Sequence, residues 1–307
     1  MFNQRRLKFT FVSFLILLSL ILVDIFQLQT EEFDSTSQTI DRQNLDKFYI
    51  TAPRGEIYDI NGEKIVRTIL EPHLFINLRK ITNQNLLNYK QIIQYNFSEL
   101  DNNEINEIFD SKEILSLVIN LSNVEYEVRN NLLMNYDAFE ILDLPIRQYI
   151  QNELFAHTIG YLGKPNQDDT GEFINALRNN QVGKNGLERQ YEDFLSGTSG
   201  EIIFEGSKII NFKQPIPGND LFLSIDSSTQ SVVRESLQQG IELANKSFAS
   251  SSEIKRGAAV VLDIETGNVV SMVSLPDYDP NKFITGISDF EYKQLDREQA
   301  FNNFAIQ

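Results

Sequence analysis

The sequence has no cysteine, and only two of its 307 residues are histidine, His73 and His157. Without cysteine the chain has no disulfide framework, no thiolate nucleophile and no thiolate metal ligands. Two histidines are too few for a multi-histidine metal site. Basic residues are fewer than acidic ones: the chain has 27 Lys and Arg and 43 Asp and Glu, which gives a formal net charge of −16. Such a surface repels a phosphate backbone. We therefore expect no metal, no cofactor and no nucleic-acid partner.

One long uncharged run lies near the N-terminus. Residues 9–23 carry no charge and the apolar stretch continues to Leu28, which is long enough for a helix to cross a bilayer. Basic residues precede it (Arg5, Arg6 and Lys8) and acidic residues follow it, so the N-terminus is expected in the cytoplasm and the bulk of the chain outside. A cleaved signal peptide would need small residues after the apolar core, whereas VDIFQLQTEEF stands there. We predict an uncleaved anchor (about 9–28) within a first region, 1–45.

The next region mixes helical and strand patterns, which indicates an α+β fold. Asn61-Gly62 between short apolar runs predicts a hairpin. The periodicity predicts strands at 74–76, 114–121 and 138–146, and helices at 83–109, broken near Asn96, and at 123–135. Lys213–Asp220, which holds two prolines and a glycine, is the best boundary between region 46–219 and region 220–307.

The region after this boundary begins with an expected strand, Leu221–Ile225. Ser227 or Ser228 is expected to cap a helix whose apolar stripe runs from Val233 to Ala244. Residues 257–263 and 268–273 then predict two strands of a hairpin. The region 220–307 is therefore also α+β.

Short motifs rich in glycine and charge recur along the whole chain. In order they are Pro53-Arg54-Gly55-Glu56-Ile57-Tyr58-Asp59-Ile60-Asn61-Gly62, Arg147-Gln148-Tyr149, residues 156–163, Gly183-Lys184-Asn185-Gly186-Leu187-Glu188 followed by Tyr191 and Glu192, residues 217–221, Ser224-Ile225-Asp226, residues 256–263, Thr266-Gly267-Asn268-Val269, Pro280-Asn281-Lys282-Phe283 and residues 283–288. This ordered set resembles the class B penicillin-binding proteins. Residues 283–288 are most similar to the elongation subgroup, often called penicillin-binding protein 2. The chain departs from the family pattern at Ile60, where arginine is common, and at Ile150, where proline is common.

We interpret the motif residues as structural and none as catalytic. Arg54, Asp59 and Glu188 are expected to form a buried ion network, because an unpaired buried charge is costly. A direct contact with a partner is the alternative. The glycines are expected where the backbone has a positive φ or passes close to another segment. The complete set is Arg54, Gly55, Asp59, Asn61, Gly62, Arg147, Tyr149, Gly160, Gly183, Gly186 and Glu188.

The reaction of this family is acyl transfer through a serine ester, and its groups are not found here. It requires Ser-x-x-Lys at the start of a helix, Ser-x-Asn, and Lys-Thr-Gly on a strand. Ser252–Lys255 matches the first spacing but lies in a serine-rich loop before a strand, so we do not expect a nucleophile there. Ser-x-Asn is absent from the sequence. We predict a fragment that ends before the active serine and has no activity of its own.

One acidic pair has a metal-binding alternative. Asp277-Tyr278-Asp279 resembles the pair that binds a metal in some sugar transferases, but Pro280 follows it. The proline favours a turn, and we predict a turn.

The resemblance implies a function for the complete protein. It implies a peptidoglycan D,D-transpeptidase of cell-wall elongation, anchored in the inner or plasma membrane, that acts on D-Ala-D-Ala-ended stem peptides and is acylated by β-lactams. It also implies a dimerisation or pedestal domain at 46–219, the truncated start of a transpeptidase domain at 220–307, and a SEDS-family glycosyltransferase as membrane partner. Two rivals remain: a non-catalytic scaffold or activator, and a β-lactam sensor, which usually carries more membrane segments.

Overall fold

The computed structural model describes residues 45–173, 176–247 and 253–306. The chain divides at Asp46 into two units, and the elements below belong to the second, Lys47–Gln307, apart from the first two residues of its opening strand. The predicted membrane anchor, residues 9–28, lies outside the described residues. Within the residues that are described, no helix combines the length and the apolar character that a membrane span requires.

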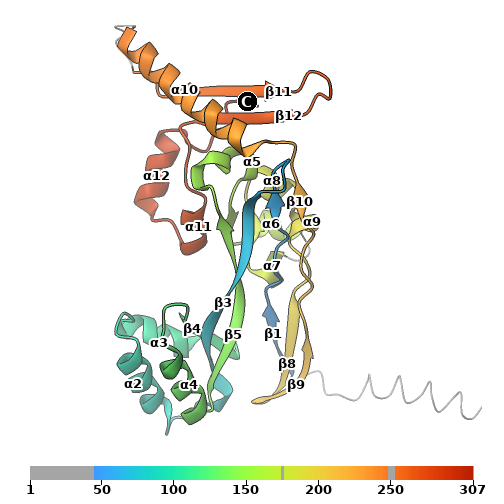
Figure 1. Ribbon diagram of the computed structural model, residues 1–307. Helices are drawn as coiled ribbons and strands as arrows, with labels where there is room; N and C mark the ends of the chain where they lie inside the picture. The colour runs from blue at the N-terminus through green and yellow to red at the C-terminus, as the bar shows by residue number, and fades with distance from the viewer. Residues whose placement is uncertain (1–44, 174–175, 248–252, 307) are drawn as a thin grey trace, which may run out of the picture. The chain divides into compact units, whose positions relative to one another are not determined.

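A five-stranded sheet forms the centre of this unit (Figure 1). Its order is β10–β2–β3–β4, and β5 pairs with β3, antiparallel, from Val66↔Tyr149 to Ile76↔Phe139. The β2–β3 hairpin turns at Asn61-Gly62, as predicted, where Gly62 has a φ of +80°. The strands are β2 (Ile57–Tyr58), β3 (Lys64–Asn77), β4 (Leu115–Asn120), β5 (Phe139–Tyr149) and β10 (Leu221–Phe222).

Three helices cover one face of this sheet at the end where β4 lies (Figure 1). They are α2 (Leu86–Asn96), α3 (Asn102–Asp110) and α4 (Tyr126–Asn135), and the 3₁₀ turn η1 (Leu78–Lys80) precedes them. Ile93 of α2 and Leu132 of α4 are buried against β3 and β5. Asp101 and Glu104 form a capping box that starts α3, and this box separates α3 from α2. The predicted helices, with their break near Asn96, are confirmed.

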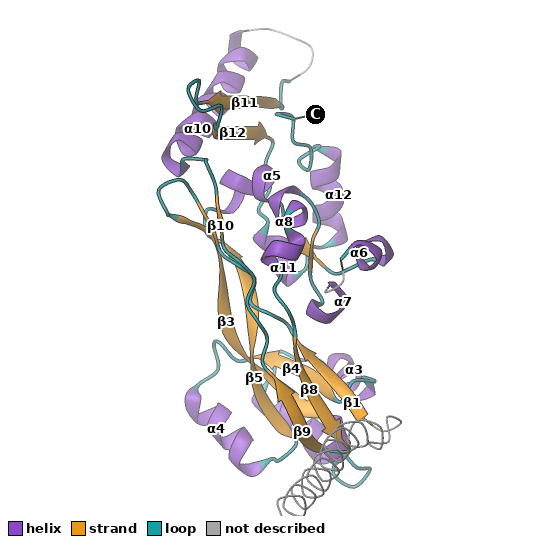
Figure 2. Cartoon of the chain, turned by 90° about the vertical axis from the view of Figure 1, so that its right-hand side faces the viewer, coloured by secondary structure: helices purple, strands orange, loops and turns teal. Residues whose placement is uncertain are grey.

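A second sheet covers the other face of the same end (Figure 2). Its order is β1–β8–β9, with β1 (Leu45–Ile50), β8 (Gly200–Glu205) and β9 (Lys208–Lys213). Ile202 and Phe204 of β8 pack against Phe75 and Leu115 of the central sheet. The end of the unit therefore has three layers, sheet on sheet on helices.

Short elements connect β5 to β8 and carry most of the remaining motifs. The strands β6 and β7 pair antiparallel, Leu162 with Gly183 and Gly163 with Val182. The elements are η2 (Asn152–Phe155), α5 (Ala156–Ile159), β6 (Leu162–Gly163), α6 (Gln167–Glu172), α7 (Ala176–Asn179), β7 (Val182–Gly183), α8 (Gly186–Gln190) and α9 (Glu192–Leu195).

The C-terminal segment consists of a long helix beside a hairpin, followed by two short helices. Its elements after β10 are α10 (Ser227–Ser247), β11 (Gly257–Leu262), β12 (Val269–Leu275), α11 (Asn281–Thr285) and α12 (Asp289–Arg297). The predicted β11–β12 hairpin is confirmed. Gln230 of α10 is fully buried; its amide nitrogen donates to Met272 O, and its oxygen accepts from Ser271 Oγ and Met272 N. This side chain fixes α10 to β12.

Two expectations for this segment are corrected. The strand predicted at 221–225 is only Leu221–Phe222, because it pairs with the two-residue strand β2. The helix is capped by Asp226 rather than by a serine: Asp226 Oδ1 accepts from Thr229 N at 2.6 Å. An ionised carboxylate is a stronger acceptor for an N-terminal amide than a hydroxyl. The fold as a whole is α+β, as predicted.

Candidate functional site

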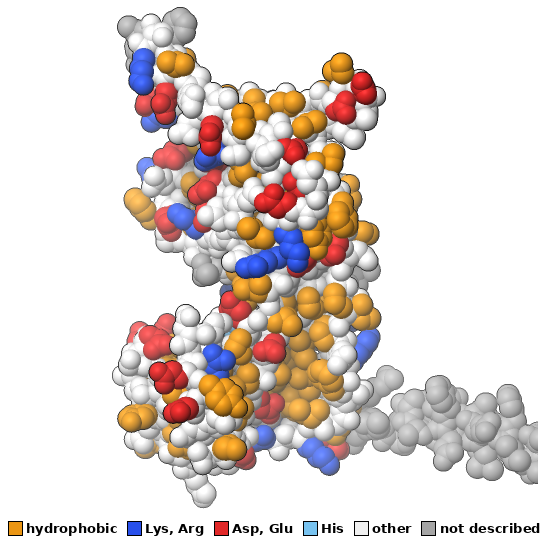
Figure 3. All heavy atoms as spheres, in the orientation of Figure 1, with side chains coloured by type: hydrophobic (Ala, Val, Ile, Leu, Met, Phe, Trp, Pro, Cys, Tyr) orange, Lys and Arg blue, Asp and Glu red, His pale blue; other side chains and the backbone are white. Residues whose placement is uncertain are grey.

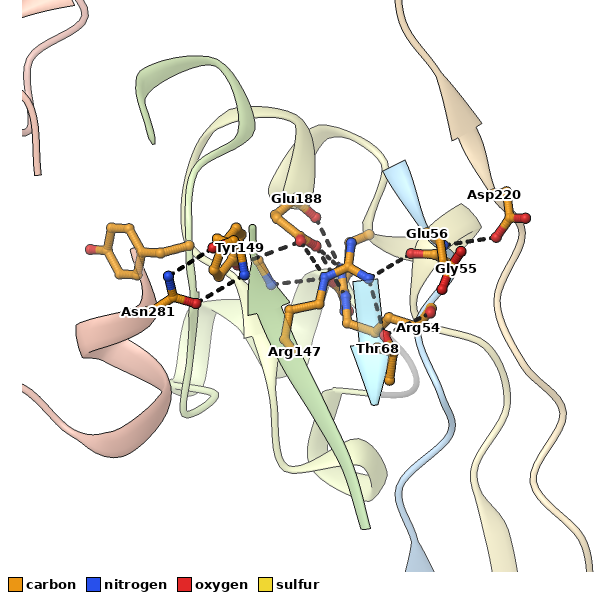
Figure 4. Close-up of polar contacts among 12 residues, drawn as sticks. Arg54, Gly55, Glu56, Thr68, Arg147, Tyr149, Glu188, Asp220 and Asn281 are labelled. Carbon is orange, nitrogen blue, oxygen red and sulfur yellow. Dashed lines mark hydrogen bonds and ion pairs between the residues drawn. The ribbon is translucent and has the colours of Figure 1, made fainter. Parts of the chain in front are cut away.

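Four charged side chains from three motifs meet in the interior (Figure 4). Arg54 donates from Nε and Nη2 to Glu188 Oε2, at 3.1 and 2.8 Å, and from Nη1 and Nη2 to Glu192, at 3.0 and 2.9 Å. Arg147 donates from Nε to Glu188 Oε1 at 2.8 Å. None of the four is more than 6% exposed. We call Arg54, Arg147, Glu188 and Glu192 the ion network.

The ion network is electrically balanced, with two cations and two anions. Burial alone would raise the pKa of the Glu188 carboxyl, but the charges of Arg147 and Arg54 outweigh it, so that pKa lies below its ordinary value. Burial likewise opposes the charged form of Arg54, and the two carboxylates more than offset it, so its pKa is raised. The geometry therefore indicates a charged cluster that holds its segments together.

Arg147 extends the ion network to the backbone of the first motif. Its Nη1 donates to Gly55 O at 2.6 Å and to Thr68 Oγ1 at 3.1 Å, and Thr68 Oγ1 in turn donates to Arg54 O at 2.9 Å. Sequence reasoning placed Arg147 in a motif but not in the network. Glu192, four residues after Glu188, was likewise named with a motif but not expected in the network.

Asp59 lies outside the ion network, which corrects the expectation that grouped it with Arg54 and Glu188. It is buried at the β2–β3 turn, where its Oδ1 accepts from the amides of Asn61 and Glu63, both at 2.8 Å. Its Oδ2 accepts from Ser227 N at 3.2 Å. Burial would raise the pKa of Asp59, but these amide donors lower it below its ordinary value. Asn61 Nδ2 also donates to Asp226 at 2.7 Å, so the turn holds the start of α10.

Gly160 and Gly186 let two motifs cross at close range. They have φ values of +84° and +59°, and a Cβ on Gly160 would lie 2.1 Å from Asn185 O. The left-handed backbone region is strained for any residue with a Cβ. Gly183 contacts the ion network directly, because its backbone amide donates to Glu192 Oε2 at 2.8 Å. These positions agree with the predicted close approaches.

Tyr149 joins the ion network to the C-terminal segment. Its amide donates to Asn281 Oδ1, and Asn281 Nδ2 donates to Tyr149 O, both at 2.9 Å. The Tyr149 hydroxyl lies 3.5 Å from Glu188 Oε1. The side chain of Asn281 thus pairs with the end of β5 as a neighbouring strand would (Figure 4). No local pattern marks this contact, which joins residues 132 positions apart.

The first motif also pairs with the segment that follows the predicted boundary. Glu56 N donates to Asp220 Oδ1 at 2.7 Å, and β2 runs parallel to β10 with Ile57 opposite Leu221. Ile57, Tyr149 and Ile225 are buried in one core. Residues on both sides of Lys213–Asp220 therefore share a hydrophobic core.

Aromatic side chains form a second contact between the two segments. Tyr161 stacks on Phe283 with ring centroids 3.9 Å apart, and His157 meets Tyr278 edge to face at 5.6 Å. His157 Nε2 lies 2.8 Å from Ala300 O. Burial lowers the pKa of His157, so its neutral form donates this bond.

The described residues contain no arrangement for acyl transfer or metal binding. Ser252 lies outside them, and Lys255 pairs with Glu253 at 3.3 Å. Asp277 pairs with Arg234 at 2.6 Å, while Asp279 accepts from Asn281 N at 2.9 Å in the turn before α11. No group of three potential ligands converges in the part of the chain that the structure covers. The contacts around this site hold together the segments that lie before and after Lys213–Asp220.

Comparison with known proteins decides the family. The model of the penicillin-binding protein dimerisation domain matches residues 49–223. The chain is 30% identical to peptidoglycan D,D-transpeptidase MrdA of Haemophilus influenzae over 95% of its own length, and 29% identical to MrdA of Escherichia coli K12, also over 95%. The chain belongs to the elongation-type class B penicillin-binding proteins. It spans 45% and 46% of the length of these two relatives.

The fold agrees with that of a solved penicillin-binding protein. The structure of a complex between penicillin-binding protein PBP2 and MreC from Helicobacter pylori matches with a TM-score of 0.64 and 25% identity, over 85% of this chain and 49% of that chain.

Proposed function

We propose that this chain is part of a peptidoglycan D,D-transpeptidase of cell-wall elongation. Residues 46–219 would form its pedestal, and residues 220–307 the start of its transpeptidase domain, which Asn281 and the β2–β10 pairing join to the pedestal. The observation that carries the proposal is this junction, because three motifs of the pedestal bind one another through buried charges, and the Asn281 side chain of the following segment binds the backbone of Tyr149. The relatives named D,D-transpeptidase over the same residues support it.

The test is covalent labelling with a fluorescent penicillin. A longer chain that continues through Ser-x-x-Lys, Ser-x-Asn and Lys-Thr-Gly should take up one label, and changing its motif serine to alanine should abolish the label. The 307-residue chain should remain unlabelled. A label on Ser252 of the 307-residue chain, or none on the longer one, would contradict the proposal.

The remaining parts of the proposal concern location and partners. We infer a single membrane crossing at residues 9–28, with the pedestal on the outer side of the inner or plasma membrane, from the basic residues before the apolar run. A SEDS-family glycosyltransferase is the proposed membrane partner. Stem peptides ending in D-Ala-D-Ala and β-lactams are the proposed ligands of the longer chain.

A role as scaffold is the second candidate, and one observation favours it. Hydrophobic side chains gather over the strands in the lower half of the view in Figure 3, and exposed hydrophobic residues on β3, β4 and β9 include Leu70, Leu117 and Phe212. Exposed apolar areas often mark protein interfaces. Since the Helicobacter pylori neighbour was solved with MreC, we propose an MreC-like protein as the partner that covers these exposed residues.

Phe212→Asp should reduce co-purification of the chain with this MreC-like partner, while the midpoint of thermal unfolding should be unchanged.

A further inference from the structure

A groove lies between α2 and α4, away from the ion network. Its volume is about 510 Å³, and its walls include Gln91, Tyr95, Asn96, Glu127, Asn131 and Tyr136. Ile92 and Val128 supply its aliphatic part. The groove opens on the helical layer and has no part in the contacts that join the pedestal to residues 220–307.

The lining is rich in amides and tyrosines and has no basic residue. Amide groups both donate and accept hydrogen bonds, and so does a phenol. Among the described residues, the Gln91 amide and the hydroxyls of Tyr95 and Tyr136 form no hydrogen bond, and the Asn96 amide uses only its nitrogen, toward Ile92 O at 2.8 Å. The groove therefore presents several uncommitted donors and acceptors to one volume.

Its two aromatic rings differ in how they are held. Tyr136 is fixed by edge contacts with Tyr89 and Phe139, each with centroids 6.1 Å away. Tyr95 is 88% exposed and has no aromatic neighbour within the described residues. The groove therefore offers one ring held by its neighbours and one exposed ring, and either can stack on the apolar face of a flat ligand.

These properties exclude most classes of ligand. Without Lys or Arg in its walls, and with Glu127 among them, the groove does not favour phosphates, nucleic acids or acidic peptides. With only two aliphatic residues it offers little to the apolar face of a helix or to a lipid chain. A sugar ring has apolar C–H faces and a rim of hydroxyl and amide groups, which matches one exposed and one half-buried aromatic ring framed by amides.

We propose that this groove binds a neutral amino-sugar chain, the glycan strand of peptidoglycan. The choice of glycan rests on the proposed function, since the substrate polymer of a cell-wall transpeptidase is built on such strands. The pedestal would then hold a strand at its helical layer, independently of the peptide chemistry. The occupant is the polymer backbone and not the stem peptide.

The probe is the N-acetylglucosamine tetramer, followed by saturation-transfer NMR on the full 307-residue chain. The wild-type chain should transfer saturation to the sugar ring protons and the N-acetyl methyl groups. Tyr95→Ala and Gln91→Ala should each weaken binding by about 2- to 10-fold, the loss expected for one stacked ring or hydrogen bond. Tyr126→Ala is the matched control, because Tyr126 is 74% exposed on α4 and does not line the groove.

The outcomes separate this proposal from the function on which it rests. Circular dichroism should be the same for all variants, since the substituted side chains are exposed. No transfer to the tetramer, an equal loss in Tyr126→Ala, or transfer only to a free stem peptide or a protein partner would overturn the glycan groove. A longer chain carrying Tyr95→Ala should still be labelled by penicillin. Failure of labelling with glycan binding retained would overturn the transpeptidase and leave the groove standing.

Discussion

At the scale of single residues, Glu188 is the centre of the ion network because its two oxygens serve two different arginines. Glu188→Gln keeps the shape of the side chain but removes one of the two carboxylates of the ion network. Glu192 then remains as the single counter-charge for Arg54 and Arg147 in the network. We expect a loss of roughly 3–5 kcal/mol in the free energy of unfolding, typical of a broken buried ion pair. Urea unfolding followed by circular dichroism measures it.

The control for this prediction is an exposed carboxylate on a neighbouring helix. Glu172 pairs with Arg189, and its side chain is 54% exposed. Glu172→Gln should cost less than about 1 kcal/mol, because water screens exposed pairs. Equal losses in the two variants would mean that the ion network does not stabilise the junction.

Alanine substitutions at two glycines are expected to change stability in opposite directions. Gly186→Ala places a Cβ 2.6 Å from the backbone of Gly160 and Ile159 at a φ of +59°, so it should destabilise by more than about 1–2 kcal/mol. Gly240 lies inside α10 with nothing near its missing Cβ, so Gly240→Ala should stabilise by about 0.5–1 kcal/mol. The midpoints of thermal unfolding should therefore move in opposite directions.

At the scale of elements, the docking of residues 276–306 should depend on pH through His157. Burial lowers the pKa of His157 in the folded chain, whereas the unfolded value is about 6.5. The undocked state therefore binds the proton more readily, and stability is complete above about pH 6.5 and is lost as the pH falls below it. Two side chains lie near the His157 ring: Tyr278 contacts it edge to face, and the charge of Asp277 raises the pKa of His157, but by less than burial lowers it.

Amide hydrogen exchange of residues 281–306 at pH 7.5 and pH 6.0, corrected for intrinsic rates, measures this effect. Protection should fall at the lower pH in the wild-type chain and change little in His157→Gln, which keeps a donor for Ala300 O. His73→Gln is the control and should retain the wild-type pH dependence. Unchanged protection in the wild type would remove His157 from this role.

The elements that the sequence predicted are those with a local signal. The helices around Asn96 and the β11–β12 hairpin show periodicity and turn residues, and the structure has them. The β8–β9 hairpin was missed because β9 is exposed along its whole length, so it has no alternation to detect. The cap of α10 was misassigned because Asp226 competes with two adjacent serines for the same amides.

The candidate site was predictable in its residue types and not in its pairings. Arg54 and Glu188 could be grouped because buried charges need partners, but Asp59 has an equal need and satisfies it with backbone amides instead. The Tyr149–Asn281 pair has no sequence signal, since an asparagine side chain that completes a strand looks like any other asparagine. Long-range pairing is decided by packing, which a single sequence does not display.

At the scale of the whole molecule, the charge asymmetry around residues 9–28 predicts which side of the membrane holds the pedestal. Alkaline phosphatase fused after Gln307 should be active, because it folds only outside the cytoplasm. Moving the basic residues Arg5, Arg6 and Lys8 to the other end of the apolar run should reduce that activity. An active cytoplasmic reporter at the same position would reverse the topology.

The spacing of the partners of the first motif also has a consequence for synthesis. Arg54 meets Glu188 and Glu192 after 134 and 138 residues, and Glu56 meets Asp220 after 164. At about 5–20 residues per second, a ribosome needs on the order of ten seconds to make that intervening chain. During this interval the guanidinium of Arg54 stays in water, because Glu188 and Glu192, the two carboxylates that pair with it, do not yet exist. The first motif therefore reaches its final contacts late, and the rate at which this part of the chain folds depends on when residues 188–220 have been made.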